Sequence, residues 1–382
     1  MFNGKELECV CYVFGRFAVG ICFGGVSRRR KTIGGENMCK RLTVIIPGYN
    51  TRKDWWRRCV ESVRKACGPK DEIICVDDGS KVPVKESWVG ADVDERVRLI
   101  RTENGGLSSA RNAGMDLMQG KYVAFVDSDD EVKKGVFNQA IDQLEKTQSD
   151  VCVYGVQTIW VDERLTKLDN PGNGNFGCIV PADVKNLLRE RVLNYAWNKV
   201  YVVDFITGIQ TARNRRLTFE PDGMPCEDII FNLECICAGA RWCAVDYVGY
   251  IYYRCGMTLL SSYKSSNQKG LLLCSEAWRR YKEAAPEAKD VFGPFGEIDE
   301  AGLLKAEWTN LWKPGSPLGW RAKRKWLQAN RHKMGVSGAI WIAMTKAAVF
   351  SFARKHLYFR PVRRWNIKRQ YPYATEWEGV AE

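Results

Sequence analysis

Carboxylate side chains follow an apolar run of the sequence at a spacing that suits cation binding. Asp127-Ser128-Asp129 comes directly after Tyr122–Val126, a run that predicts a buried strand. Two carboxylates spaced by one residue at a strand end can reach a common hard cation, and Mg²⁺ or Mn²⁺ held in this way keeps positions open for phosphate oxygens. Such an ion neutralises the charge that develops on a diphosphate leaving group. A solvated turn that caps the next helix is the alternative interpretation.

Two further polar segments carry candidate binding groups. Asp77–Ser80 (DDGS) follows a second apolar run, and a carboxylate there can accept a hydrogen bond from the imide N–H of a uracil ring. The alternative for this segment is an ordinary Asp-Gly turn. In Glu103–Gly114, two glycines lead into a helix start, where backbone N–H groups are free, and Arg111 lies about one turn inside the helix. Arg111 would then reach an anionic ligand, unless the segment is a plain capped helix with a solvated arginine.

The elements that must position these residues are strands alternating with helices. Strands are predicted at Leu42–Ile46, Glu72–Val76, Arg98–Arg101, Tyr122–Val126, Val151–Val156 and Tyr247–Tyr253, with helices at Trp55–Ala66 and at Ser108–Gln119, the latter capped by Ser108 and Gly120. This alternation predicts an α/β fold with a parallel sheet. Pro47–Asn50, Asp77–Ser80 and Asp127–Asp130 each follow a strand's C-terminal end, where open α/β sheets bind ligands. We therefore expect these three loops to converge on one site.

Four segments stand in the order and at the intervals of motifs in a known family. They are Val44–Asn50 (VIIPGYN), Val76–Ser80 (VDDGS), Glu103–Gly114 (ENGGLSSARNAG) and Val123–Asp130 (VAFVDSDD). Together they resemble the inverting family 2 glycosyltransferases of bacterial surface-polysaccharide synthesis, over roughly Arg41–Tyr253. The resemblance implies the GT-A fold, a Rossmann-like, mostly parallel mixed α/β sheet flanked by helices. It also implies transfer of a sugar from a nucleotide-diphospho-sugar, a UDP-sugar, to a hydroxyl of a glycan or lipid-linked acceptor.

The resemblance assigns roles in the donor half of the site. Pro47 and Tyr49 would line the nucleotide pocket with Tyr49 against the base, Asp78 would bind the uracil edge, and Arg111 would lie near the ribose and diphosphate. The nucleotide-sugar-binding residues implied in this way are Pro47, Tyr49, Asn50, Asp78, Asn104, Arg111, Asp127, Lys199 and Arg254. Asp127 and Asp129 would hold Mn²⁺ or Mg²⁺, with Asp129 favoured as the direct ligand.

The resemblance also implies a catalytic pair, Glu227-Asp228, at the opening of a helix. Asp228 would be the general base, which removes the acceptor hydroxyl proton as that oxygen attacks the anomeric carbon from the face opposite the diphosphate. The alternative is that acidic residues merely favour a helix N-terminus. Gly48 replaces a bulkier residue that is frequent in the family. Residues 157–225 fit the family poorly, so the acceptor stays open.

Length and composition favour one large domain with an appendage. The chain has 382 residues, 45% of them hydrophobic. We expect 1–37 to be a disordered or non-native extension, 38–262 to be the GT-A domain and 263–382 to be a helical, membrane-associating region. Gly34-Gly35-Glu36 can be encoded by purine-rich codons that resemble a bacterial ribosome-binding site, so Met38 is a candidate start. Detection of peptides from before Met38 in the natural protein would refute this. Fifteen cysteines in so long a chain favour a reduced, cytosolic compartment over a disulfide scaffold.

The C-terminal region is basic, and the formal net charge of the chain is +13. Trp320–Glu382 holds fourteen Lys or Arg and three acids, and the apolar run Gly335–Phe352 has basic residues on both sides. This pattern is compatible with an interfacial segment, a core helix or a short bilayer span. We expect a peripheral position at the inner face of the cell membrane.

Two functions of other classes remain as alternatives. A nucleotide-sugar-binding protein without turnover would not need Asp228. A nucleic-acid binder would use the basic tail, but no known nucleic-acid motif occurs, and we expect no nucleic-acid partner.

Overall fold

The computed structural model describes residues 40–160, 195–211, 215–221, 225–254, 265–284, 300–313 and 315–334. Contacts divide the chain into two compact units, Met1–Met38 and Cys39–Glu382, and every described residue belongs to the second. The predictions for 1–37 and for Gly335–Phe352 lie outside the described residues. The predicted boundary between 262 and 263 stays a prediction.

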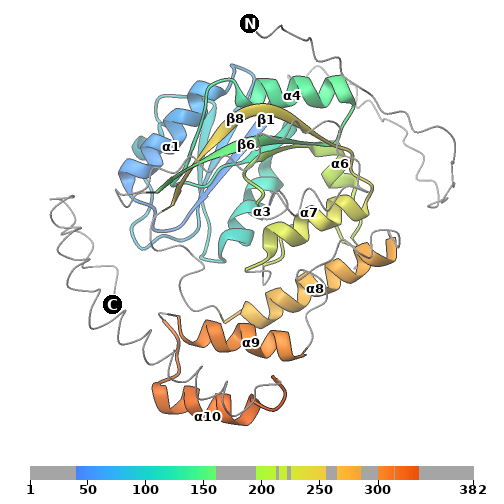
Figure 1. Ribbon diagram of the computed structural model, residues 1–382. Helices are drawn as coiled ribbons and strands as arrows, with labels where there is room; N and C mark the ends of the chain where they lie inside the picture. The colour runs from blue at the N-terminus through green and yellow to red at the C-terminus, as the bar shows by residue number, and fades with distance from the viewer. Residues whose placement is uncertain are drawn as a thin grey trace, which may run out of the picture. The chain divides into compact units, whose positions relative to one another are not determined.

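The described residues form one eight-stranded mixed sheet with helices on both faces (Figure 1). The strands are β1 Lys40–Gly48, β2 Glu72–Asp77, β3 Val97–Arg101, β4 Gly120–Phe125, β5 Glu131–Val132, β6 Val151–Trp160, β7 Lys199–Val202 and β8 Trp242–Arg254. The helices are α1 Lys53–Ala66, α2 Glu86–Val89, α3 Leu107–Leu117, α4 Val136–Thr147, α6 Val203–Gly208, α7 Glu227–Cys237, α8 Asn267–Ala284, α9 Glu300–Leu311 and α10 Trp320–Asn330. The predicted α/β class is confirmed.

The sheet order is β3-β2-β1-β4-β7-β6-β8-β5. Parallel ladders join β3 to β2, β2 to β1, β1 to β4 and β6 to β8, whereas β7 runs antiparallel to β4 and β6, and β5 antiparallel to β8. The expectation of a mostly parallel mixed sheet is therefore confirmed. Because β2, β1 and β4 are parallel neighbours, the loops that follow them emerge at the same edge.

Alternate residues of each strand supply the two apolar layers of the core. In β1, Ile45 packs in the layer that contains α3, α6 and α7, while Val44 and Ile46 pack in the layer that contains α1, α2 and α4. Figure 1 shows these two helical layers on opposite faces of the sheet. Burial on both faces explains why the strands read as continuous apolar runs.

The predicted caps of α3 are wrong. The residue before the helix is Gly106, with φ 85°, a value that favours glycine. Ser108 lies inside the first turn, and its buried Oγ has no hydrogen-bond partner in the part of the chain that the structure describes. The helix ends at Leu117, followed by Met118, and Gly120 instead begins β4. A Cβ on Gly120 would lie 2.5 Å from the backbone N of Thr43, so close strand approach, rather than helix capping, requires glycine there.

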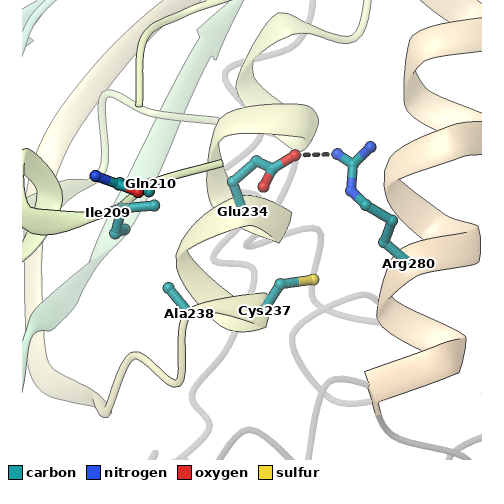
Figure 2. A pocket seen from close by; sticks show the side chains of 6 residues that line it. All are labelled: Ile209, Gln210, Glu234, Cys237, Ala238 and Arg280. Carbon is teal, nitrogen blue, oxygen red and sulfur yellow. Dashed lines mark hydrogen bonds and ion pairs between the residues drawn. The ribbon is translucent and has the colours of Figure 1, made fainter. Parts of the chain in front are cut away.

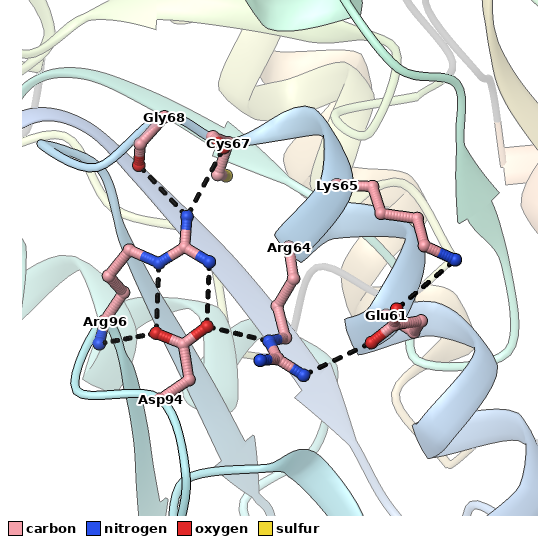
Figure 3. A network of polar contacts seen from close by, with 7 residues as sticks. All are labelled: Glu61, Arg64, Lys65, Cys67, Gly68, Asp94 and Arg96. Atoms are coloured by element: carbon pink, nitrogen blue, oxygen red, sulfur yellow. Dashed lines mark hydrogen bonds and ion pairs between the residues drawn. The ribbon is translucent and has the colours of Figure 1, made fainter.

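Ion pairs and hydrogen bonds link the end of α1 to the turn before β3 (Figure 3). The Asp94 carboxylate, 9% exposed, accepts hydrogen bonds from Arg96 Nε and Nη2 and from Arg64 Nε. Arg96 Nη1 also donates to the carbonyls of Cys67 and Gly68. The hydrogen bonds from Arg96, and then those from Arg64, hold the pKa of Asp94 well below its usual range.

The described part of the predicted C-terminal region is helical. Cys274, Ala277, Trp278 and Tyr281 of α8 belong to the same apolar cluster as α7. A separate small cluster joins α9 to α10 through buried Trp308 and Leu327. Among the described residues, no helix has the length and apolar character required to cross a bilayer.

Candidate functional site

The loops that follow β1, β2 and β4 are bonded to one another. Asn50 N–H donates to Ser80 Oγ at 2.9 Å, and Lys81 N–H donates to Asn50 Oδ1 at 2.8 Å. The hydroxyls of Thr51 and Ser128 lie 2.7 Å apart. The expected convergence of the three loops at the strand ends is confirmed.

The end of β1 presents an aromatic ring beside a tightly packed glycine. Pro47 is buried, whereas the Tyr49 ring is 47% exposed and open to a stacking partner. A Cβ on Gly48 would lie 2.3 Å from Trp56 Cζ2 and 2.7 Å from Ser128 Oγ. The large indole of Trp56 therefore explains why glycine stands here instead of a bulkier residue. Asn50 adopts a positive φ of 52°, which asparagine tolerates better than most residues.

Asp78 closes the loop that leads into α3. Its buried carboxylate accepts the N–H groups of Gly105 at 3.0 Å and Gly106 at 2.8 Å. The turn is tight, because a Cβ on Gly79 would lie 2.6 Å from the N of Asn104, whose side chain is exposed. Both carboxylate oxygens are thus already bonded, and a uracil N–H would share one of them, since each oxygen has two acceptor sites.

The Asp127–Asp130 loop is held through its backbone. Arg58 donates to the carbonyl of Asp129, Cys59 Sγ donates to the carbonyl of Asp127, and Asp127 N–H donates to Tyr250 Oη. These contacts come from α1 on one side and β8 on the other. They fix the loop without using the carboxylates of Asp127 and Asp129.

These two carboxylates fit a divalent cation. Within the described residues Asp129 has no ion pair, and burial, followed by the negative charge of Asp127, raises its pKa to about 6. Burial also raises the pKa of Asp127. A cation near both would relieve this cost, and carboxylate oxygens suit Mg²⁺ or Mn²⁺. Among the described residues, no group of three or more His, Cys, Asp or Glu could hold a metal ion. Mg²⁺ is commonly bound by one or two carboxylates together with substrate phosphates.

Arg111 joins the two predicted halves of the site. Its side chain is 1% exposed, Nη2 lies 3.2 Å from Asp127 Oδ1, and Nη1 donates to Asp228 Oδ1. Nη1 also lies 3.9 Å from Glu227 Oε1. Burial alone would lower the pKa of Arg111, but the three carboxylates raise it above its usual value. The structure thus brings together Asp127 and Asp228, which are 101 positions apart in the sequence.

Glu227 and Asp228 open α7, as predicted, and they differ in their surroundings. Asp228 Oδ2 accepts Ala196 N–H at 2.9 Å, and its other oxygen faces Arg111. Glu227 Oε2 is buried, and no described residue forms a hydrogen bond with it. Burial, together with the charge of Asp228, raises the pKa of Glu227 to about 7. Two adjacent carboxyl groups therefore lie in different hydrogen-bonding surroundings.

Lys199 and Arg254 are two further residues that were predicted to bind the nucleotide sugar. Lys199 on β7 is fully buried and donates to the Tyr195 carbonyl and to Asn198 Oδ1. Burial lowers its pKa to about 7, and the charge of Asp228 partly offsets this. Lys199 therefore reaches a substrate only if those contacts change. Arg254 is the last residue of β8, and its side chain lies outside the described residues.

Sequence reasoning missed two aromatic residues of this region. The Phe219 ring centre lies 5.1 Å from the Arg111 guanidinium carbon. Tyr250 Oη donates to the buried carboxylate of Asp130 at 2.8 Å while it accepts Asp127 N–H. The aromatic strand around Tyr250 was visible in the sequence, but the short segment around Phe219 shows no periodic pattern that predicts burial.

A pocket of about 200 Å³ lies along the other half of α7 (Figure 2). It is lined by Ile209, Gln210, Glu234, Cys237, Ala238 and Arg280. Figure 2 shows the Arg280 guanidinium of α8 paired with Glu234. Its lining includes neither Arg111 nor any of the three carboxylates around it, and none of the lining residues was predicted to bind donor or acceptor.

Comparisons with known proteins agree with these motifs. Residues 43–204 match the family model described as "Glycosyl transferase family 2". The uncharacterised glycosyltransferase EpsJ of Bacillus subtilis (strain 168) is 29% identical over 220 residues, 56% of this chain and 61% of EpsJ. The succinoglycan biosynthesis protein ExoO of Rhizobium meliloti (strain 1021) is 27% identical over 214 residues, 56% of this chain and 60% of ExoO. The matches thus span less than two thirds of either relative.

The fold is also shared with a solved structure. S. aureus TarS 1–349, solved with UDP-GlcNAc, superposes with a TM-score of 0.54 at 17% identity, and the match covers 84% of this chain and 93% of that one.

Proposed function

We propose that this chain belongs to glycosyl transferase family 2, whose model residues 43–204 match, and that it is a glycosyltransferase of polysaccharide biosynthesis. It moves a sugar, with inversion, from a nucleotide-diphospho-sugar to a hydroxyl of a glycan or lipid-linked acceptor. The UDP-GlcNAc complex of TarS supports a UDP-sugar as the donor class. The names of EpsJ and ExoO support the enzyme class and the pathway.

The observation that carries the proposal is the meeting of Asp127, Glu227 and Asp228 around one buried guanidinium. Asp127 belongs to the loop at the parallel strand ends, where the donor diphosphate would lie. Asp228 belongs to the helix on the acceptor side. A sugar between them would have its leaving group near one acid and its attacking hydroxyl near the other, which is the arrangement that single inverting displacement requires.

The residues divide the reaction between them. Tyr49 stacks on the base at the rim, and Asp78 meets the edge of the base. A divalent cation held by Asp127 and Asp129 would supply positive charge to the departing diphosphate. Asp228 accepts the proton of the acceptor hydroxyl, since its carboxylate oxygens keep acceptor capacity beyond the bonds to Ala196 and Arg111.

Incubation of the purified protein with a panel of nucleotide sugars, Mn²⁺ and a lipid-linked acceptor tests this function. We expect one donor to release its nucleoside diphosphate and to label the acceptor, and EDTA to stop both. Donor binding without release of diphosphate for any donor or acceptor in the panel would favour the non-enzymatic alternative. Neither binding nor release with any of the nucleotide sugars would refute the proposal.

We further propose that the protein lies at the inner face of the membrane, with α10 against anionic lipid. Trp320 is 41% exposed at the start of α10, and Arg321, Arg324 and Lys325 are exposed beside it. The sequence from Trp320 to Met334 contains no acid, so this surface attracts negative headgroups. Sedimentation with phosphatidylglycerol vesicles should be lost when these three cations are replaced by Gln. Equal binding to phosphatidylcholine vesicles, or salt-sensitive binding to DNA alone, would contradict it.

A further inference from the structure

Arg111 is committed to protein carboxylates on both terminal nitrogens. Nη1 bonds Asp228 and Nη2 bonds Asp127, and the side chain is 1% exposed. The ring of Phe219 lies over the guanidinium at 5.1 Å. The family resemblance implied that Arg111 lies near the ribose and diphosphate. A guanidinium has further N–H donors, but this one is 1% exposed, so a donor phosphate would reach them only if the surrounding side chains moved.

The aromatic cover on Arg111 is itself fixed from the same helix. Asn112 Nδ2 donates to the Phe219 carbonyl at 2.8 Å, and Phe219 N–H donates to Asn112 Oδ1 at 2.9 Å. The Phe219 ring stacks on Phe231 of α7, with centroids 4.2 Å apart and planes 6° apart. Two neighbouring residues of α3 therefore hold α7. Arg111 pairs with the carboxylates in the first turn of α7, and Asn112 holds Phe219, whose ring stacks on α7.

These contacts set the orientation of the Asp228 carboxylate. One oxygen is bonded to Arg111 and the other to Ala196 N–H, so the carboxylate plane cannot turn without breaking a bond. A guanidinium presents its donors in a rigid fork, so the line from Asp127 through Arg111 to Asp228 is also fixed. The distance between the donor-side acid and the acceptor-side acid is thus determined by one side chain.

We propose that Arg111 is a positioning residue for sugar transfer, which holds the Asp228 carboxylate in register with Asp127, rather than a ligand of the donor diphosphate. This inference rests on the proposed function, because it takes Asp228 as the base. A base that is displaced by about 1 Å loses about 10²-fold in rate, so the fork matters even though it touches no substrate.

Arg111→Lys tests the proposal, because lysine keeps the positive charge but cannot bridge two carboxylates in a fixed geometry. We expect kcat for transfer to fall about 10²-fold while the Kd for the donor with Mn²⁺ stays within about threefold. Arg96→Lys is the matched control, since it breaks a bidentate arginine–aspartate pair remote from the cluster (Figure 3). That control should lower stability and leave kcat and Kd unchanged.

Hydrogen exchange of the backbone over 225–231 gives a readout that does not need activity. We expect faster exchange there in Arg111→Lys and not in Arg96→Lys. A donor Kd that weakens as much as kcat/KM falls would identify Arg111 as a donor ligand and overturn the inference, as would wild-type kcat in Arg111→Lys. If the unaltered protein transfers no sugar, the proposed function fails, and unchanged exchange over 225–231 would separately refute the positioning role.

Discussion

Asp228→Asn should reduce sugar transfer by at least about 10³-fold and leave donor binding nearly intact, because general-base catalysis is worth about 10²–10⁴-fold. The substitution preserves shape and removes the acceptor of the hydroxyl proton. The loss should be enhanced because both neighbours of this carboxylate are donors, namely Arg111 Nη1 and Ala196 N–H. The NH₂ group of the new Asn side chain would face one of these two donors, and that donor would then lose its acceptor. Initial rates of transfer and the donor Kd by calorimetry provide the measurement.

Two further variants make this result specific. Asp116→Asn changes an acid on α3 that is 68% exposed, and it should behave as the unaltered protein does. Glu227→Gln changes the preceding carboxyl, whose Oε2 has no hydrogen-bond partner among the described residues and whose pKa is raised to about 7. If Asp228→Asn keeps its activity while Glu227→Gln loses it, the base is Glu227 and the assignment to Asp228 is wrong.

Asp129→Asn should weaken Mn²⁺-supported donor binding about 10–100-fold, the loss typical when a metal site loses a supporting group, or by more if Asp129 is the direct ligand. The loop backbone should keep its place, since Arg58 holds the carbonyl of this residue and Tyr250 holds the preceding turn. Titration of the donor into each protein with Mn²⁺, and again with EDTA, gives the comparison.

The titration with EDTA shows whether the weaker donor binding of Asp129→Asn comes from loss of the metal. In the variant, removal of the metal should change the donor Kd little, because the metal contribution is already lost. A variant that still gains full donor affinity from Mn²⁺ would show that the metal is held elsewhere. The exposed Asp54, paired with Arg52 at the start of α1, serves as the control position.

The strands and their loops could be predicted because a strand that is buried on both faces is a continuous apolar run in the sequence. Ile73, Ile74 and Cys75 are all buried, so an uninterrupted apolar run marks β2 and its end marks the loop. The ends of α3 could not be predicted in the same way. Gly120 looks like a helix cap in the sequence, and only the distance to Thr43 in β1 shows that strand packing requires it.

The site could be predicted in part for a related reason. Asp127, Asp129, Glu227 and Asp228 stand in recognisable motifs, but no motif tells which groups bond to each other. Arg111 was expected to bind a ligand, and its burial among carboxylates depends on α7, which lies more than one hundred residues later. Lys199 is likewise fully buried and bonded to the Tyr195 carbonyl and to Asn198 Oδ1, which no motif in the sequence indicates.

Gly48 and Trp56 occupy one volume between them, and this limits how the protein can diverge. A methyl group at position 48 would overlap the indole by more than a flexible neighbour can absorb. A relative with a bulkier residue there must therefore have carried a smaller side chain at position 56, or a shifted α1. Steric exclusion thus couples positions 48 and 56, and we expect Tyr49 to keep its place only if a larger residue at 48 is matched by a smaller one at 56.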